Sequence, residues 1–259
     1  MKAAALSFLF FIGAAAPASA WGPDGHRIAC AVAWDEMAAP ARTTVGALLG
    51  IFTKDAFAGS CAAFAMPPET ASLHHVFVPK TARAVDLARD CAHGCALTAI
   101  DRSLDVLKSS AATLEKTQAL QTLAHLVADI HQPLNIGFAQ DGGGAEIKGT
   151  FRGAPVTLRA MWEREMIATL VKPNSSGPFY DFMSIAGRAP QAAARAPLDW
   201  ANETLWIMRS PATGYLGTPG GIDYDDIYVQ QNRRVALEQL DKAGVRLAAL
   251  LTEIFGGKS

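Results

Sequence analysis

The sequence has 259 residues, half of them hydrophobic, which is enough for one large domain with a substantial core. Its formal net charge is −1 at pH 7, so the chain has no overall positive charge with which to bind duplex nucleic acid, and a polyanionic ligand would need local positive charge. Beyond residues 1–20, no run free of charges and proline reaches the length of about 20 apolar residues that a membrane-spanning helix needs. We therefore expect no association with a membrane.

Residues 1–20 have the pattern of a secretory signal peptide. Lys2 gives a positively charged start, residues 3–16 are apolar, and the Ala-Ser-Ala sequence that ends at Ala20 is typical of a cleavage site. The sequence thus predicts an exported mature chain, 21–259, located in the periplasm or outside the cell. Cleavage removes one lysine and no acidic residue, so the charge of the mature chain would be −2.

The mature chain would begin at Trp21, in the sequence Trp-Gly-Pro-Asp-Gly-His that ends at His26. The free α-amino nitrogen and the carbonyl oxygen of Trp21 can chelate a metal ion, and His26 can complete the set. This requires cleavage at that one bond, because an additional residue would displace the amino group.

Helical periodicity dominates the rest of the chain. We expect helices at 28–37, 99–109, 117–130 and 235–255. The third is apolar on nearly all sides, which is typical of a central buried helix, and Gln132-Pro133 ends it. Strand signals are confined to 146–152 and 155–158, after the glycines at 142–144, and they predict one small hairpin. The sequence therefore predicts an all-α fold, a mostly helical single domain with a small β-hairpin.

Export would permit disulfide bonds, and four cysteines allow three pairings. The spacing favours a bridge between Cys91 and Cys95, across a short loop in which Gly94 can adopt the required backbone angles. A metal site at these two cysteines is the competing interpretation, but it lacks two further ligands nearby. Cys30 and Cys61 either form a second bridge or remain buried thiols.

Histidines and an acidic residue interrupt two apolar segments. His125 and Asp129 are four residues apart on the predicted central helix, so both side chains project from one face. Burying them is costly without a strong partner, which is either a metal ion or a hydrogen bond between the two. His74 and His75 interrupt the apolar run 73–78, and we expect one of them to face inward. His131, just before Gln132, can cap the end of the helix.

Taken together, the motifs resemble the zinc-dependent nucleases of the S1/P1 type, in collinear order over essentially the whole mature chain. The matching segments are Trp-Gly-x-x-Gly-His at 21–26, Leu-His at 73–74, the cysteine loop at 90–100, His-Leu-Val-Ala-Asp-Ile-His-Gln-Pro-Leu at 125–134, Asp-Gly-Gly at 141–143, Trp-Glu-Arg-Glu at 162–165, Trp-Ala-Asn-Glu at 200–203 and Lys-Ala-Gly-Val-Arg-Leu-Ala at 242–248.

The resemblance implies a mostly helical fold shared with zinc-dependent phospholipase C, and a trinuclear zinc cluster that hydrolyses single-stranded RNA and DNA and 3′-nucleotides. Carried over residue by residue, Trp21, His26 and Asp129 would hold one zinc ion, and His74, His125 and Asp129 a second. Asp129 would then bridge the two ions and have the catalytic role, because the ions share a hydroxide whose pKa they lower.

Three family positions differ in this chain. Met66 stands where the family has an aspartate, Asn135 replaces a histidine, and Arg159 with Glu163 replaces the His-x-x-x-Asp pair that binds the third zinc. Methionine and asparagine are weak zinc ligands, and arginine is none because it stays protonated. The resemblance therefore predicts two zinc ions and a lost third site, at which Arg159 would offer a fixed charge to a phosphate oxygen.

The leading hypothesis is an exported zinc-dependent phosphodiesterase that acts on single-stranded nucleic acids or 3′-nucleotides through a metal-bridged hydroxide, with a reduced metal centre. The alternative is a catalytically inactive relative that binds zinc or a nucleotide. Phospholipase C activity is a third hypothesis, which the cysteine loop and the segment 200–203 disfavour because both resemble the nuclease branch. No obligate protein partner is expected.

Overall fold

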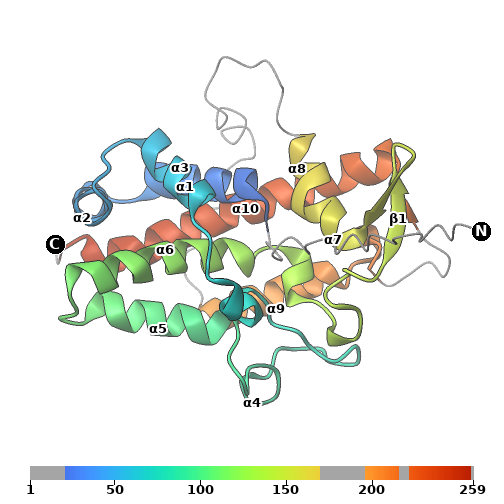
Figure 1. Ribbon diagram of the computed structural model, residues 1–259, viewed down its shortest axis with the longest axis horizontal. Helices are drawn as coiled ribbons and strands as arrows, with labels where there is room; N and C mark the ends of the chain where they lie inside the picture. Colours follow the sequence, from blue (N-terminus) through green and yellow to red (C-terminus); the bar gives the residue numbers. More distant parts are fainter. Residues whose placement is uncertain (1–20, 170–195, 216–221, 258–259) are drawn as a thin grey trace, which may run out of the picture.

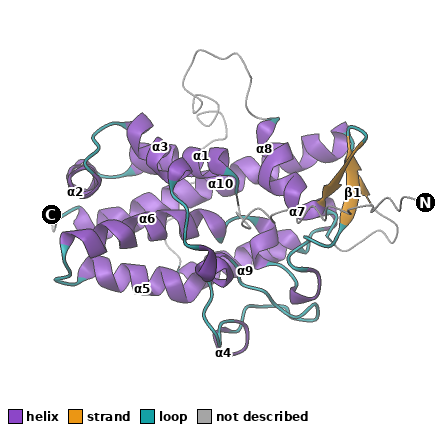
Figure 2. Cartoon of the chain, viewed as in Figure 1, coloured by secondary structure: helices purple, strands orange, loops and turns teal. Residues whose placement is uncertain are grey.

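The computed structural model describes residues 21–169, 196–215 and 222–257, so the predicted signal peptide lies outside the described residues. Helices make up most of the described chain, and strands are confined to one end (Figure 2). The α-helices are α1 (Pro23–Glu36), α2 (Ala39–Leu49), α3 (Lys54–Ala63), α4 (Leu87–Asp90), α5 (Ala96–Lys108), α6 (Thr113–Asp129), α7 (Leu158–Ala160), α8 (Met166–Ala168), α9 (Pro197–Met208) and α10 (Asp226–Phe255). Two 3-10 helices, η1 (Pro68–His74) and η2 (Pro133–Ile136), flank the site described below, and a π-helical turn, Met161–Glu165, joins α7 to α8.

The four predicted helices are confirmed, with shifted ends. The first begins earlier than expected, because Pro23 occupies the first helical position, where its missing N–H costs nothing. The central helix, α6, begins at Thr113, and the Glu115 side chain accepts a hydrogen bond from the Ala112 N–H at that end. It ends at Asp129, ahead of Pro133, as the sequence predicts.

The longest helix, α10, organises the core. In the centre of Figure 1, α10 runs the length of the molecule, and it packs against α1 on one side and α6 on another. Helix α1 also packs on α3, and α5 on α6. Helices α10 and α1 touch at Gly244, where an added Cβ would lie 2.5 Å from the Cβ of Val32, so only glycine permits this approach.

The predicted hairpin is confirmed and gains a third strand. Strands β1 (Lys148–Phe151) and β2 (Ala154–Thr157) pair antiparallel, and β3 (Ile222–Asp223) pairs parallel with β1, giving the order β2-β1-β3. The turn uses the left-handed conformation at Arg152 and Gly153. The sequence did not predict β3, because a two-residue strand is too short to show alternation.

The structure contains two disulfide bonds. Cys91 and Cys95 are bonded, which confirms the predicted pair. Cys30 and Cys61 are also bonded, so the open alternative of buried thiols is excluded. This second bond joins α1 to α3.

A buried polar network fixes the end of α6 against α9 and α10. His131 donates from Nδ1 to the Val127 carbonyl at 2.6 Å, which confirms the predicted cap, and its Nε2 lies 2.7 Å from Nη1 of Arg246. Glu203 on α9 accepts from Arg246 and from Lys242. Burial raises the pKa of Glu203, but these two hydrogen bonds and charges outweigh burial and lower the pKa to about 2.

The Glu203→Gln substitution should lower the free energy of unfolding at pH 7 by about 1–2 kcal/mol, because charged hydrogen bonds are lost at a partly exposed site. The folded-state pKa lies below the usual value of 4.5, so the Glu203 contribution is complete above pH 4.5 and disappears as the pH falls towards 2. Urea denaturation of the wild type and the variant from pH 7 to pH 3 measures this convergence.

The matched control is Glu253→Gln, which removes an exposed ion pair with Lys108 and should change stability little. A Glu203→Gln effect that does not vary with pH would contradict the assignment of the network.

Candidate metal centre

The candidate centre is built around Asp129, the last residue of α6. Its side chain is completely buried, and its two oxygens face different histidines. Oδ1 lies 3.0 Å from Nε2 of His26, which projects from the first turn of α1. Oδ2 lies 2.7 Å from Nδ1 of His74, the last residue of η1, and 3.4 Å from Nε2 of His125.

The three histidines also contact one another. The rings of His26 and His125 stack with centroids 4.1 Å apart, and Nε2 of His125 lies 3.2 Å from Nδ1 of His74. All three side chains are buried. The structure thus brings together four residues that the sequence nominated from three separate segments.

The protonation states suit metal binding. Burial lowers the pKa of His125 to about 3, against an opposing effect of Asp129, so this ring is neutral at pH 7. Burial alone would raise the pKa of Asp129, but His125, His26 and His74 hold it well below its usual range. A neutral imidazole and an ionised carboxylate are the forms that coordinate metals.

The donor set fits a metal ion in both spacing and orientation. Zinc–nitrogen and zinc–oxygen bonds of about 2.0–2.2 Å place neighbouring ligand atoms of a tetrahedral site roughly 3.3 Å apart, close to the separations of 2.7–3.4 Å around Asp129. One donor atom each from His26, His125 and Asp129 lies within 4.8 Å of the others. His26 is further oriented because its Nδ1 lies 3.3 Å from the Gly22 carbonyl, which directs Nε2 towards Asp129.

Trp21 lies beside this cluster. Its indole is completely buried, and Nε1 donates to the carbonyl of Ala128 at 3.0 Å, one residue before Asp129. Gly22 donates its N–H to the Glu163 carbonyl at 2.9 Å. These two contacts fix Trp21 and Gly22 between α6 and the π-helical turn.

Asn135, Arg159 and Glu163 form a connected group next to the cluster. The Asn135 side-chain amide donates to the Asp129 carbonyl at 3.1 Å, and its oxygen accepts from Arg159 Nη1 at 3.2 Å. The same Nη1 donates to Glu163 Oε1 at 3.1 Å. Burial raises the pKa of Glu163 to about 7, although Arg159 opposes the rise. The guanidinium therefore occupies one side-chain oxygen of Asn135 and one of Glu163.

Sequence reasoning missed two features of this region. We expected one of His74 and His75 to face inward, and both are buried; His75 stacks on Phe77, and its Nε2 has no hydrogen-bond partner among the described residues. The edge of Phe64 contacts His125, with centroids 5.7 Å apart. No signal in the sequence marked Phe64. Met66 is half-buried and packs against the core instead of contributing a ligand.

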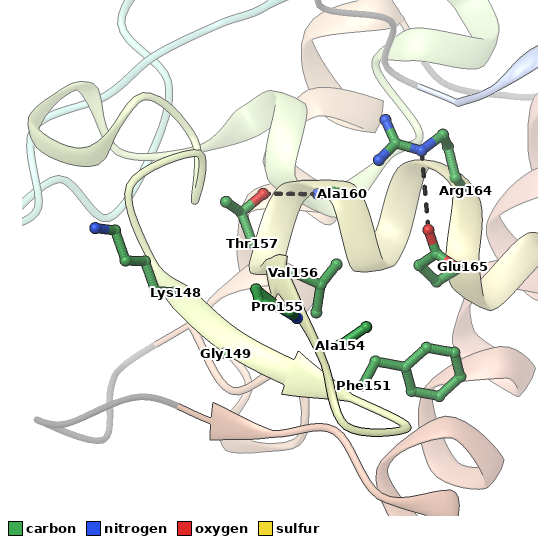
Figure 3. Close-up of a pocket in the computed structure, with 10 residues that line it drawn as sticks. All are labelled: Lys148, Gly149, Phe151, Ala154, Pro155, Val156, Thr157, Ala160, Arg164 and Glu165. Carbon is green, nitrogen blue, oxygen red and sulfur yellow. Dashed lines mark hydrogen bonds and ion pairs between the residues drawn. The ribbon is translucent and has the colours of Figure 1, made fainter.

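A cavity of about 590 Å³ lies beside the hairpin (Figure 3). It is lined by β1, β2, the end of α7 and the π-helical turn, in which Arg164 and Glu165 form an ion pair. None of its lining residues belongs to the histidine cluster. Arg164, which lines the cavity, follows Glu163, whose backbone carbonyl accepts from Gly22 and whose side chain accepts from Arg159.

Comparison with known proteins identifies the family. A family model described as S1/P1 nuclease matches residues 21–256. The chain belongs to the S1/P1 nuclease family.

Its relatives in that family come from plants and fungi. Endonuclease 1 of Arabidopsis thaliana is 25% identical over 91% of this chain and 87% of its own length. Nuclease S1 of Aspergillus oryzae is 34% identical over 34% of this chain and 31% of its own, and Nuclease P1 of Penicillium citrinum is 30% identical over 58% of this chain and 60% of its own. Membership of the S1/P1 nuclease family indicates a nuclease that hydrolyses phosphodiester bonds.

His125→Ala tests whether the cluster binds metal. Loss of a group that only orients a ligand costs about 10–100-fold in metal affinity, so loss of a ligand should cost at least that. Zinc affinity measured by chelator competition, with zinc content measured by mass spectrometry, should fall accordingly. His93→Ala is the control, because His93 is exposed in the cysteine loop and should leave zinc binding unchanged. Equal affinity of the His125 variant and the control would contradict the site.

Proposed function

We propose that this chain is an exported zinc-dependent phosphodiesterase that cleaves single-stranded RNA or DNA, or 3′-nucleotides, with a centre of two zinc ions. The observation that carries the proposal is the carboxylate of Asp129, one oxygen of which faces His26 while the other faces His74 and His125. A carboxylate with histidines on both oxygens is suited to bridging two ions.

In this proposal Trp21, His26 and Asp129 hold one zinc ion, and His74, His125 and Asp129 hold the other. Bound zinc would supply a hydroxide nucleophile at neutral pH and a positive charge for the phosphate. The protein residues fix the geometry. Helix α6 presents His125 and Asp129 one turn apart, and Asn135 holds the Asp129 backbone by its hydrogen bond to the carbonyl.

We further propose that no third ion binds at Arg159 and Glu163. The guanidinium stays charged at all relevant pH values and already occupies Oε1 of Glu163 and Oδ1 of Asn135. Its other amino group, Nη2, is buried and has no hydrogen-bond partner among the described residues. A buried donor without a partner calls for an explanation, and a phosphate oxygen of the substrate is a suitable acceptor.

Gly143 makes room for that acceptor. It adopts a left-handed conformation with φ of +66°, and an added Cβ would lie 2.7 Å from Nη2 of Arg159. Any other residue at 143 would therefore press on the guanidinium. The glycine leaves the side of Nη2 uncrowded.

The same ion pair favours a second candidate function. If Arg159 and Glu163 only replace a metal ion and contact no substrate, the chain would be a catalytically inactive relative that binds zinc or a nucleotide. The two functions differ in turnover: zinc content without hydrolysis of polynucleotides or 3′-nucleotides would favour the binding protein.

Export is supported by two disulfide bonds and by the family match, which begins at Trp21. In the described parts of the chain, none of the helices combines the length and apolarity needed to cross a membrane. We propose the periplasm or the extracellular space as its location.

An additional N-terminal residue tests the role of Trp21. Protein processed after Ala20 should bind zinc and cleave single-stranded substrates in a chelator-sensitive manner. A version with one extra residue before Trp21 should bind less zinc and cleave more slowly, because the α-amino nitrogen is displaced from one of the two proposed ions. Zinc content and hydrolysis are measured on both forms. Equal zinc content would exclude the terminal ligand, and zinc-free processed protein would exclude the metal centre.

Arg159→Ala tests the phosphate contact. Inhibition by inorganic phosphate should weaken about tenfold or more, because hydrogen bonds to charged groups are worth about 1.5–3 kcal/mol, while zinc content stays at the wild-type level. The control Glu163→Gln removes the carboxylate charge but keeps Arg159, and it should retain most of the phosphate affinity. Unchanged phosphate inhibition in Arg159→Ala would contradict the contact.

A further inference from the structure

An exposed tryptophan marks a surface on α9, away from the histidine cluster. The Trp206 side chain is 76% exposed, whereas Trp21, Trp162 and Trp200 are buried. An indole buries a large apolar area when a ligand or partner covers it, so the exposed Trp206 side chain could contribute strongly to binding.

Trp206 borders a surface cavity of about 350 Å³, which we call the Trp206 groove. Its lining residues are Arg83, Trp206, Arg209, Ser210 and Pro211. The guanidinium of Arg209 is held in place because Nη1 donates to the carbonyls of Lys80 and Ala82 at 3.0 and 3.2 Å, and Cζ lies over the Phe138 ring at 5.6 Å.

The positive charge in the groove is not neutralised locally. Within residues 21–169, 196–215 and 222–257, neither Arg83 nor Arg209 forms an ion pair with a carboxylate. Asp90 of α4 is paired with Arg89, and Glu203 of α9 is paired with Lys242 and Arg246. A chain with a net negative charge thus presents, beside an exposed indole, two guanidinium groups that have no carboxylate partner in the described part of the chain.

We propose that the Trp206 groove binds a segment of single-stranded polynucleotide outside the catalytic centre, with a base stacked on Trp206 and the adjoining phosphates on Arg83 and Arg209. An aromatic platform flanked by cations suits this ligand, because every base has a stacking face and every linkage a negative charge. The site rests on the proposed function, since it acts on the strand whose scissile phosphate lies at the histidine cluster.

The groove is within reach of that strand. Lys80 follows His74 by six positions, so their Cα atoms are at most about 20 Å apart, and Arg209 is bonded directly to Lys80. Along this segment, Val76 and Val78 donate to the carbonyls of Asn135 and Gly137, which fixes its path. A polynucleotide can span the two sites, whereas a mononucleotide occupies only the centre.

Oligonucleotide binding to Trp206→Ala tests the proposal. Zinc-loaded wild type and variant are titrated with a fluorescent 12-residue phosphorothioate oligothymidylate, and hydrolysis of thymidine 3′-phosphate is measured in parallel. The variant should bind the 12-mer about tenfold more weakly, because one stacked base is lost, with mononucleotide hydrolysis unchanged. Trp206→Phe should recover most of the affinity, and Arg83→Ala should reduce the salt dependence by about 0.7 in slope.

The control is Phe52→Ala, which removes another exposed aromatic side chain, 68% exposed between α2 and α3, and should leave 12-mer affinity unchanged. Wild-type 12-mer affinity in Trp206→Ala would overturn the site, as would equal losses for the 12-mer and the mononucleotide. A change in sedimentation behaviour with unchanged 12-mer affinity would assign the surface to a protein contact instead. Failure of the proposed function is distinct, since it would appear as wild-type protein that hydrolyses neither an unmodified single-stranded oligothymidylate nor thymidine 3′-phosphate.

Discussion

The buried carboxylate of Asp129 is the constraint on which the site depends. An ionised carboxylate with no exposure to solvent is very costly unless other groups compensate it. The compensation comes from His26, His74 and His125, which reach it from α1, η1 and α6. Those three elements must therefore lie side by side at Asp129, and the packing of the surrounding helices keeps them there.

A second buried network holds the same end of α6 from the other side. His131, two residues after Asp129, contacts Arg246 of α10, which in turn contacts Glu203 of α9. Burial and the neighbouring Arg246 lower the pKa of His131 to about 3, so it is neutral and its Nε2 accepts from Arg246. The short segment from Asp129 to Asn135 is thus fixed by side chains on both faces, which limits how far the carboxylate can move.

Arg159 introduces a fixed positive charge next to the histidine cluster. A guanidinium needs no loading and cannot be removed by a chelator, but it offers directional hydrogen bonds instead of a coordination site. Its contacts to Asn135 and Glu163 connect it to the backbone of Asp129. The arrangement links the position of the Arg159 guanidinium directly to that of the carboxylate.

Local pattern alone predicted four of the helices, the end of α6 before Pro133, the hairpin and the shared face of His125 and Asp129, because these depend on residues a few positions apart. The motif order also nominated His26 and His74. Only the tertiary structure decided that they meet Asp129, from 103 and 55 residues away, that Cys30 bonds to Cys61, and that Arg159 takes the oxygens of Asn135 and Glu163. Nothing in the sequence indicated that Trp206 is exposed. Such contacts depend on how helices cross and pack, and no periodicity within one segment records that.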